Sequence, residues 1–117
     1  MTKIGTHEPV VVEASSGNIF ADLGLPDAEE TQLKSQIVIV LHRLIKARQL
    51  TQSTAAKLIG IGQPDLSHIL RGQFRGWSVE RLMRMLTVFE QDIEITVRPH
   101  EKAGEAGRIS LNVAVAV

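Results

Sequence analysis

Residues 50–72, LTQSTAAKLIGIGQPDLSHILRG, constrain the fold of this chain more than any other stretch. Small residues stand at Ala55 and Ala56, and two short helices that cross steeply need a small side chain at their contact, here Ala56. Gly60 follows where a tight turn needs a positive φ angle, which glycine adopts at little cost. Apolar residues recur at helical spacing around this turn, at Ile59, Ile61, Leu66 and Ile69. The segment therefore predicts two short helices joined by a tight turn.

The same spacing predicts which face of the second helix is free. Its apolar positions attach the helix to the rest of the domain, so the side chains between them point to solvent. The helix should begin near Gln63 and end at Gly72. Its free face then carries Gln63, Pro64, Asp65, Ser67, His68 and Arg71. This arrangement is the helix-turn-helix pattern, whose second helix enters the major groove of DNA.

Helical spacing also continues on both sides of this segment. It predicts a long helix from Asp27 to about Arg48, and Thr51 should cap the short helix from Gln52 to Ile59. Ser78 should cap a last helix, whose inward side chains are expected to be Val79, Leu82, Met83, Leu86 and Phe89. The expected fold class is mainly α, a helix-turn-helix bundle of four to five helices with a short C-terminal β extension.

Three regions follow from these patterns. Residues 1–26 are expected to form an N-terminal arm with a short helix over residues 18–23, and residues 27–92 to form the helix-turn-helix domain. Beyond Asp92 apolar residues alternate with polar ones, which predicts strands over residues 93–98 and 109–117. This β-strand extension, residues 93–117, is expected to serve dimerisation.

Charge is unevenly spread along a chain whose formal net charge is zero. Residues 42–84 carry eight Lys or Arg against two acidic side chains, a net charge of +6, whereas residues 1–41 carry a net charge of −4. A basic centre between acidic ends favours a polyanionic partner, although basic stretches are often only solvated helix faces.

Composition excludes several other classes of protein. The chain has no Cys, so disulfides and thiolate metal clusters are excluded. The longest apolar run, residues 37–41, is far shorter than a membrane helix, and the N-terminus lacks the apolar run of a secretory signal. We therefore expect a cytoplasmic protein with no membrane segment.

An enzyme is not expected. The four His residues lie far apart without a metal-ligand spacing, and the neighbours Ser67 and His68 cannot point at one another on a helix. The sequence Gly60-Ile61-Gly62 lacks the third glycine of a dinucleotide-binding loop. We expect no catalytic residues, no metal and no cofactor.

At family level, the residues LTQ…AA..IGI.Q..LS.IL.G resemble the lambda-repressor-like (Xre-family) DNA-binding domains. The flanking words SGNIFADLGLPDAEE (16–30), RGQFRGWSVERLMRML (71–86) and DIEITVRP (92–99) are similar to a subgroup of HigA-like antitoxins. Three positions depart from the family pattern. Gly62 replaces the usual Ser or Thr cap, and Gln49 replaces the glycine expected where the first helix ends. Asp92 follows Gln91 where many relatives have a glycine-containing turn.

The resemblance and the pattern together predict DNA base contacts from the second helix, at Gln63, Asp65, Ser67 and His68. Glutamine can pair bidentately with adenine, and a carboxylate can accept from cytosine. For Asp65 the alternative is stabilisation of the helix N-terminus. Phosphate contacts are predicted for Gln52, Arg71, Arg75, Arg48 and Lys46, with Arg43 a further candidate. For each basic residue the alternative is an ordinary solvated charge.

The expected function is a sequence-specific repressor, the antitoxin of a toxin–antitoxin module that controls its own operon. Its expected partners are double-stranded operator DNA, a second copy of the chain, and a RelE/HigB-like toxin that the acidic arm could face. The C-terminal strands could fold back as a hairpin or pair across the dimer. Two alternatives remain open: a stand-alone Xre-type repressor, and a protein-interaction module that uses the helix pair only as a scaffold.

Overall fold

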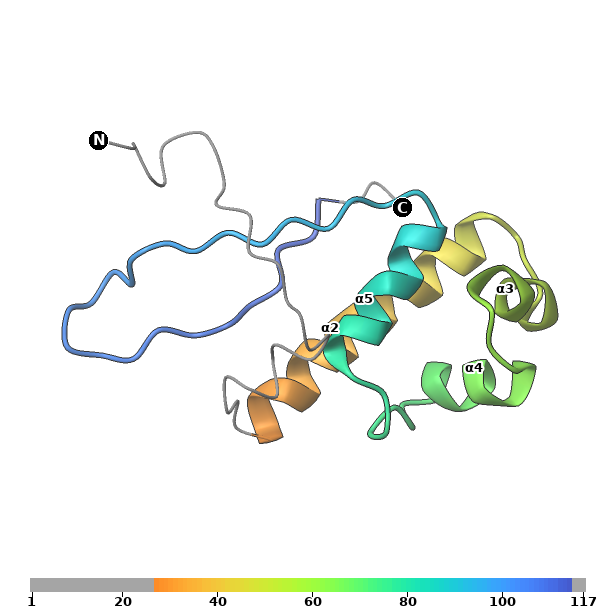
Figure 1. Ribbon diagram of the computed structural model, residues 1–117, viewed down its shortest axis with the longest axis horizontal. Coiled ribbons are helices and arrows are strands. Elements are labelled where there is room, and N and C mark those ends of the chain that lie inside the picture. Colours follow the sequence, from red (N-terminus) through yellow and green to blue (C-terminus); the bar gives the residue numbers. More distant parts are fainter. Residues whose placement is uncertain (1–26, 115–117) are drawn as a thin grey trace.

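The computed structural model of the protein describes residues 27–114. This part of the chain forms four helices: α2 (Asp27–Ala47), α3 (Gln52–Ile59), α4 (Gln63–Leu70) and α5 (Val79–Val88). The long helix α2 and α5 lie side by side, and α3 and α4 lie together at one end of this pair (Figure 1). The N-terminal arm, its predicted short helix and residues 115–117 lie outside the described residues.

One apolar core joins all four helices, and it is aliphatic apart from Phe74 and Phe89. The predicted contact residue Ala56 is buried, as is its neighbour Ala55, and these small side chains let α3 approach α4 closely. One inward position of α5 differs from the prediction, because Met85 is buried and Met83 lies only partly buried at the edge of the core.

Side-chain caps start two of the helices where the sequence predicts them. The Thr51 hydroxyl accepts a hydrogen bond of 3.1 Å from the amide of Thr54, and the Ser78 hydroxyl accepts one of 3.1 Å from the amide of Arg81. These bonds satisfy amides that have no partner inside the helix. The predicted starts of α3 and α5 are therefore confirmed.

All four helices end at a residue in the left-handed conformation. The φ angles there are 56° at Gln49, 90° at Gly60, 94° at Gly72 and 63° at Glu90. Such an end lets the next amide reach back into the last turn, as in the bond of 2.8 Å from the Gln73 amide to the His68 carbonyl. The prediction of a positive φ at Gly60 is confirmed.

The C-terminal β extension is not present within the described chain. Residues 90–114 contain no strand, and no backbone group of residues 91–114 joins the backbone hydrogen bonds found among residues 27–114. The two alternating segments leave and rejoin the helices as separate extended arms (Figure 1). Ile93, Ile109 and Leu111 instead pack against the helical core, and a lone two-stranded hairpin would be only marginally stable.

Candidate nucleic-acid interface

Helix α4 divides cleanly into a buried and a free face. Leu66 and Ile69 are 0% exposed, whereas Gln63, Asp65 and His68 are exposed and Ser67 is half-buried. The difference arises because Leu66 and Ile69 are three residues apart, so both fall on the side that faces the core. The predicted base-contacting residues therefore lie outside the buried side of α4, with Ser67 and His68 opposite it and Gln63 and Asp65 at its two borders.

The N-terminus of α4 starts without a side-chain cap. Gly62 stands at the cap position and makes no side-chain hydrogen bond, and its carbonyl accepts from the Leu66 amide at 3.1 Å. The Asp65 carboxylate leans toward this end, since a Cβ placed on Gly62 would lie 3.7 Å from Asp65 Oδ2. That position suits a carboxylate that offsets the positive end of the helix dipole, which supports the helix-stabilising interpretation of Asp65, and its exposure leaves the carboxylate accessible.

The N-terminus of α3 offers a second set of amides at the same end of the molecule. The Thr51 hydroxyl occupies only the Thr54 amide. Among the described residues, the amides of Gln52 and Ser53 make no hydrogen bond to the protein, and both residues are exposed. Free amides at a helix N-terminus favour an anion, so the end of α3 at Gln52 is suited to a phosphate.

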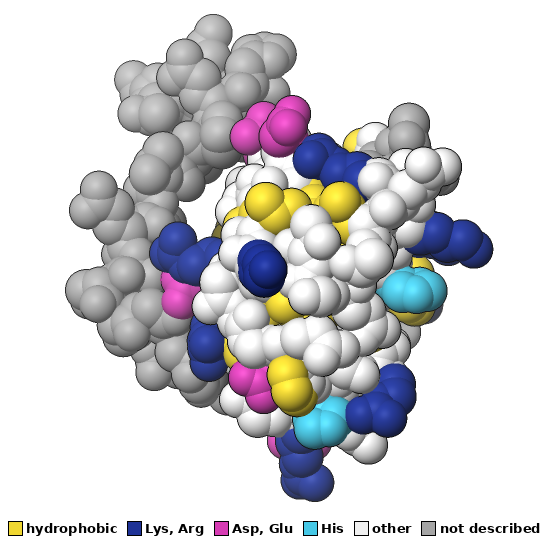
Figure 2. Space-filling model, turned by 90° about the vertical axis from the view of Figure 1, so that its right-hand side faces the viewer, with side chains coloured by type: hydrophobic (Ala, Val, Ile, Leu, Met, Phe, Trp, Pro, Cys, Tyr) yellow, Lys and Arg dark blue, Asp and Glu magenta, His cyan; other side chains and the backbone are white. Residues whose placement is uncertain are grey.

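Basic side chains border this end of the molecule. Arg71 and Arg75 are exposed on the segment that follows α4, and Lys46 is exposed in the last turn of α2. Figure 2 looks onto the side that carries α3 and α4, where Lys and Arg side chains project around the edge with few Asp or Glu side chains between them. This distribution matches the positive charge expected of a surface that meets phosphates.

Arg48 is engaged elsewhere. Its guanidinium donates a hydrogen bond of 2.9 Å to the carbonyl of Phe89, lies 3.7 Å from a carboxylate oxygen of Glu90, and stands 5.5 Å from the centre of the Phe89 ring. It thus satisfies a carbonyl at the C-terminal end of α5 and joins that end to α2. A structural role accounts for Arg48 without DNA.

Lys34 is a residue that the sequence analysis missed. It is 6% exposed, its ammonium donates a hydrogen bond of 3.3 Å to the carbonyl of Arg75, and it lies 3.6 Å from a carboxylate oxygen of Glu30. Lys34 thereby ties the segment between α4 and α5 to α2. Its spacing gave a signal, because Lys34 precedes the buried Val38 and Leu41 by four and seven residues.

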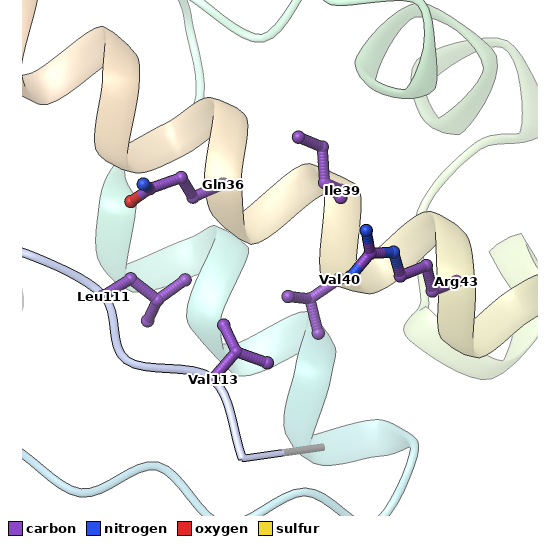
Figure 3. A pocket seen from close by; sticks show the side chains of 6 residues that line it. All are labelled: Gln36, Ile39, Val40, Arg43, Leu111 and Val113. Carbon is purple, nitrogen blue, oxygen red and sulfur yellow. The ribbon is translucent and has the colours of Figure 1, made fainter. Parts of the chain in front are cut away.

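Two hollows of the described surface are lined by α2 and the C-terminal segment and contain no residue of α4. One groove of about 170 Å³ runs between α2 and the C-terminal segment and is lined by Gln36, Ile39, Val40, Arg43, Leu111 and Val113 (Figure 3). Among residues 27–114, no three His, Asp or Glu side chains gather where they could hold a metal ion. None of the helices in that range has the length and apolarity that crossing a membrane requires.

These features define a helix-turn-helix protein, with a free second helix held on an aliphatic core. A model of the helix-turn-helix domain family matches residues 19–98. A solved structure described as an XRE-family transcriptional regulator is 40% identical, with a TM-score of 0.71, over 76% of this chain and 100% of that chain. Curated proteins give no match. The chain belongs to the XRE family of helix-turn-helix transcriptional regulators.

Proposed function

We propose that this protein is a sequence-specific DNA-binding repressor that reads its operator with α4. The observation that carries the proposal is the division of α4, whose core side holds Leu66 and Ile69 while its other side leaves the predicted base-contacting residues accessible. A helix of eight residues held in this way can enter the major groove with its N-terminal end toward the bases.

Base recognition is assigned to the side chains of Gln63, Ser67 and His68. Gln63 stands in the first turn of α4, where a side chain of the recognition helix reaches the base edges, and its amide can pair with adenine. Ser67 and His68 lie one turn further along and can each donate or accept. Asp65 either accepts from a cytosine or stabilises the helix N-terminus.

Phosphate binding is assigned to Gln52 at the start of α3 and to Arg71, Arg75 and Lys46. The amides at the start of α3 and the guanidinium groups after α4 are exposed and come from the segments that precede and follow α4 in the chain, so they are candidates to hold the phosphates on either side of the groove that α4 enters. Arg48 is left out of this set because its guanidinium already serves the end of α5.

The test is a gel shift with DNA from upstream of the protein's own gene, measured over a series of salt concentrations. Arg71→Ala should lower affinity about tenfold for every sequence and flatten the salt dependence by about one unit of slope per protomer. Gln63→Ala should instead relax the preference at one base pair, at a cost of about 1–3 kcal/mol on the preferred base.

Lys102→Ala is the matched control, because Lys102 is an exposed basic residue in the loop farthest from α3 and α4 (Figure 1). It removes one positive charge from the chain and should leave both affinity and salt slope nearly unchanged. Equal effects of Lys102→Ala and Arg71→Ala would contradict the assignment of the interface. Absence of any salt-dependent binding would favour a protein-interaction module.

We further propose that the protein acts as a homodimer and is the antitoxin of a toxin–antitoxin module. The support is the similarity of residues 16–30, 71–86 and 92–99 to HigA-like antitoxins, and the net charge of −4 over residues 1–41, which suits a basic, RNA-cleaving partner. Co-purification of the full chain with the product of the neighbouring gene tests this role. Recovery of a stable complex that blocks RNA cleavage supports it, whereas recovery of DNA alone indicates a stand-alone repressor.

A further inference from the structure

Residues 94–98 are an exposed extended segment without a partner in the described chain. Ile95 is 59% exposed and Val97 is 88% exposed, which is unusual for two large apolar side chains so close together. None of the backbone hydrogen bonds among residues 27–114 involves this segment. It therefore presents both unpaired backbone groups and apolar side chains, which together suit pairing with another strand.

We propose that residues 94–98 pair antiparallel with the same residues of a second copy of this chain, about a two-fold axis at Thr96. This pairing specifies the contact of the homodimer and so rests on the proposed function. It also explains why the segment is no strand in a single chain, because a strand needs a partner to supply its ladder of hydrogen bonds.

Charge complementarity within the segment favours this register. With Thr96 on the axis, Glu94 of each copy stands opposite Arg98 of the other, and Ile95 stands opposite Val97. The two Glu94–Arg98 pairs fall on one face and the apolar pairs on the other, since alternate residues point to opposite faces. Among residues 27–114, neither Glu94 nor Arg98 has an ion-pair partner within the chain.

Pro99 fits the same register. If Thr96 and the Glu94–Arg98 pairs are the hydrogen-bonded pairs, residues 93 and 99 face each other at a pair that makes no backbone hydrogen bonds. Proline, which has no amide hydrogen, is tolerated there and ends the strand.

A register shifted to Ile95 is disfavoured by the start of the segment. That register would place Asp92 opposite Arg98 and Ile93 opposite Val97, so Ile93 would lie within the shared ladder and not at its end. Ile93 instead packs partly buried against the helical core of its own chain, close to the end of α5. The part of the segment that is free on all sides therefore begins at residue 94 and has Thr96 at its centre.

The chain has no natural Cys, so single cysteines test the register directly. Under mild oxidation of the full-length protein, Thr96→Cys should give a covalent dimer on a non-reducing gel, because the two Thr96 Cα atoms would lie within about 5.5 Å. Ile95→Cys should not cross-link, because its two copies would lie beyond disulfide reach. Lys102→Cys, in the exposed loop, controls for random collision. Cross-linking of Ile95→Cys in place of Thr96→Cys, or of neither, would overturn the proposal.

Charge reversal tests the paired side chains without a covalent bond. Glu94→Arg or Arg98→Glu alone should raise the dimer dissociation constant about tenfold, because like charges then stand opposite each other twice. The double variant Glu94→Arg/Arg98→Glu should return the constant to within about twofold of the original. Failure of the double variant to restore dimerisation would contradict the pairing.

Sedimentation equilibrium without DNA measures the monomer–dimer equilibrium, so its result is independent of DNA binding. A monomer that still binds a half-site would overturn the pairing and leave the repressor proposal intact. A dimer that cross-links as expected but binds no DNA would support the pairing and contradict the repressor proposal.

Discussion

At the scale of single residues, the left-handed position at the end of each helix is held by glycine in two cases and by a residue with a Cβ in the other two. Gly60 and Gly72 hold such positions at the ends of α3 and α4, whereas Gln49 and Glu90 hold them at the ends of α2 and α5. A residue with a Cβ pays about 1–2 kcal/mol for this conformation, and glycine does not. The ends of α3 and α4, which carry the proposed interface, are thus free of this backbone strain, whereas the ends of α2 and α5 retain it.

Opposite substitutions at Gln49 and Gly60 should therefore change stability in opposite directions. Gln49→Gly should raise the free energy of unfolding by about 0.5–1 kcal/mol, because the relief of strain exceeds the entropy that glycine adds to the unfolded chain. Gly60→Ala should lower it by about 1–2 kcal/mol even though its Cβ would meet nothing within 4 Å.

Thermal unfolding followed by circular dichroism measures both effects, at about 4–8 °C per kcal/mol for a domain of this size. Gly76→Ala is the control, because Gly76 has no positive φ and its added Cβ would also meet open space. A loss of stability in Gln49→Gly would mean that contacts of the Gln49 side chain outweigh the backbone strain.

At the scale of elements, four of the helix ends could be predicted from the sequence because short local signals determine them. Thr51 and Ser78 are side-chain caps, and Gly60 and Gly72 are left-handed ends, so each signal acts within a turn of its own residue. The free face of α4 followed from the spacing of its apolar residues alone.

Features that depend on distant parts of the chain could not be predicted in this way. The strands expected beyond Asp92 have the right alternation, but alternation does not supply a partner for the backbone, and the described part of the chain offers none to residues 93–98. In the sequence Arg48 resembles any exposed basic residue near the helix pair. Its role depends on the carbonyl of Phe89 at the end of α5, 41 positions further along the chain.

The hydrogen bond from Lys34 on α2 to the carbonyl of Arg75 is the contact between elements that most directly concerns the proposed interface, because Arg75 is a predicted phosphate contact. Lys34→Met keeps the apolar stem and removes the ammonium, so the free energy of unfolding should fall by about 1 kcal/mol. Lys34→Ala also loses about three buried methylene groups and should cost about 3 kcal/mol in total.

Urea denaturation measures this difference, with Lys57→Met as the control, because Lys57 is exposed on α3. Trp77, the only Trp in the chain, lies two residues beyond Arg75 and reports the local change through its fluorescence. Equal stability of Lys34→Met and Lys34→Ala would argue against packing of the buried stem.

At the scale of the whole molecule, α3 and α4 have eight residues each and are far too short to be stable alone. They are held through Ala55, Ala56, Leu66 and Ile69, which belong to the same core as α2 and α5. The proposed DNA-reading surface should therefore exist only while the entire core is folded.

This dependence predicts that DNA binding and helix content are lost together. In a urea series, fluorescence anisotropy of labelled operator and circular dichroism should give the same midpoint once the stabilisation by bound DNA is subtracted. Loss of binding at a clearly lower urea concentration would show that α3 and α4 detach while α2 and α5 remain paired.

Because α3 and α4 are folded only together with the core, binding of DNA should also slow degradation of the protein in the cell. If DNA binds only the folded form, operator present at a hundredfold excess over the dissociation constant adds about 2.7 kcal/mol to stability, so the unfolded fraction falls about a hundredfold. Cellular proteases act mainly on unfolded chains, so molecules seated on the operator would outlast those free in solution, and free regulator would be the pool that is renewed.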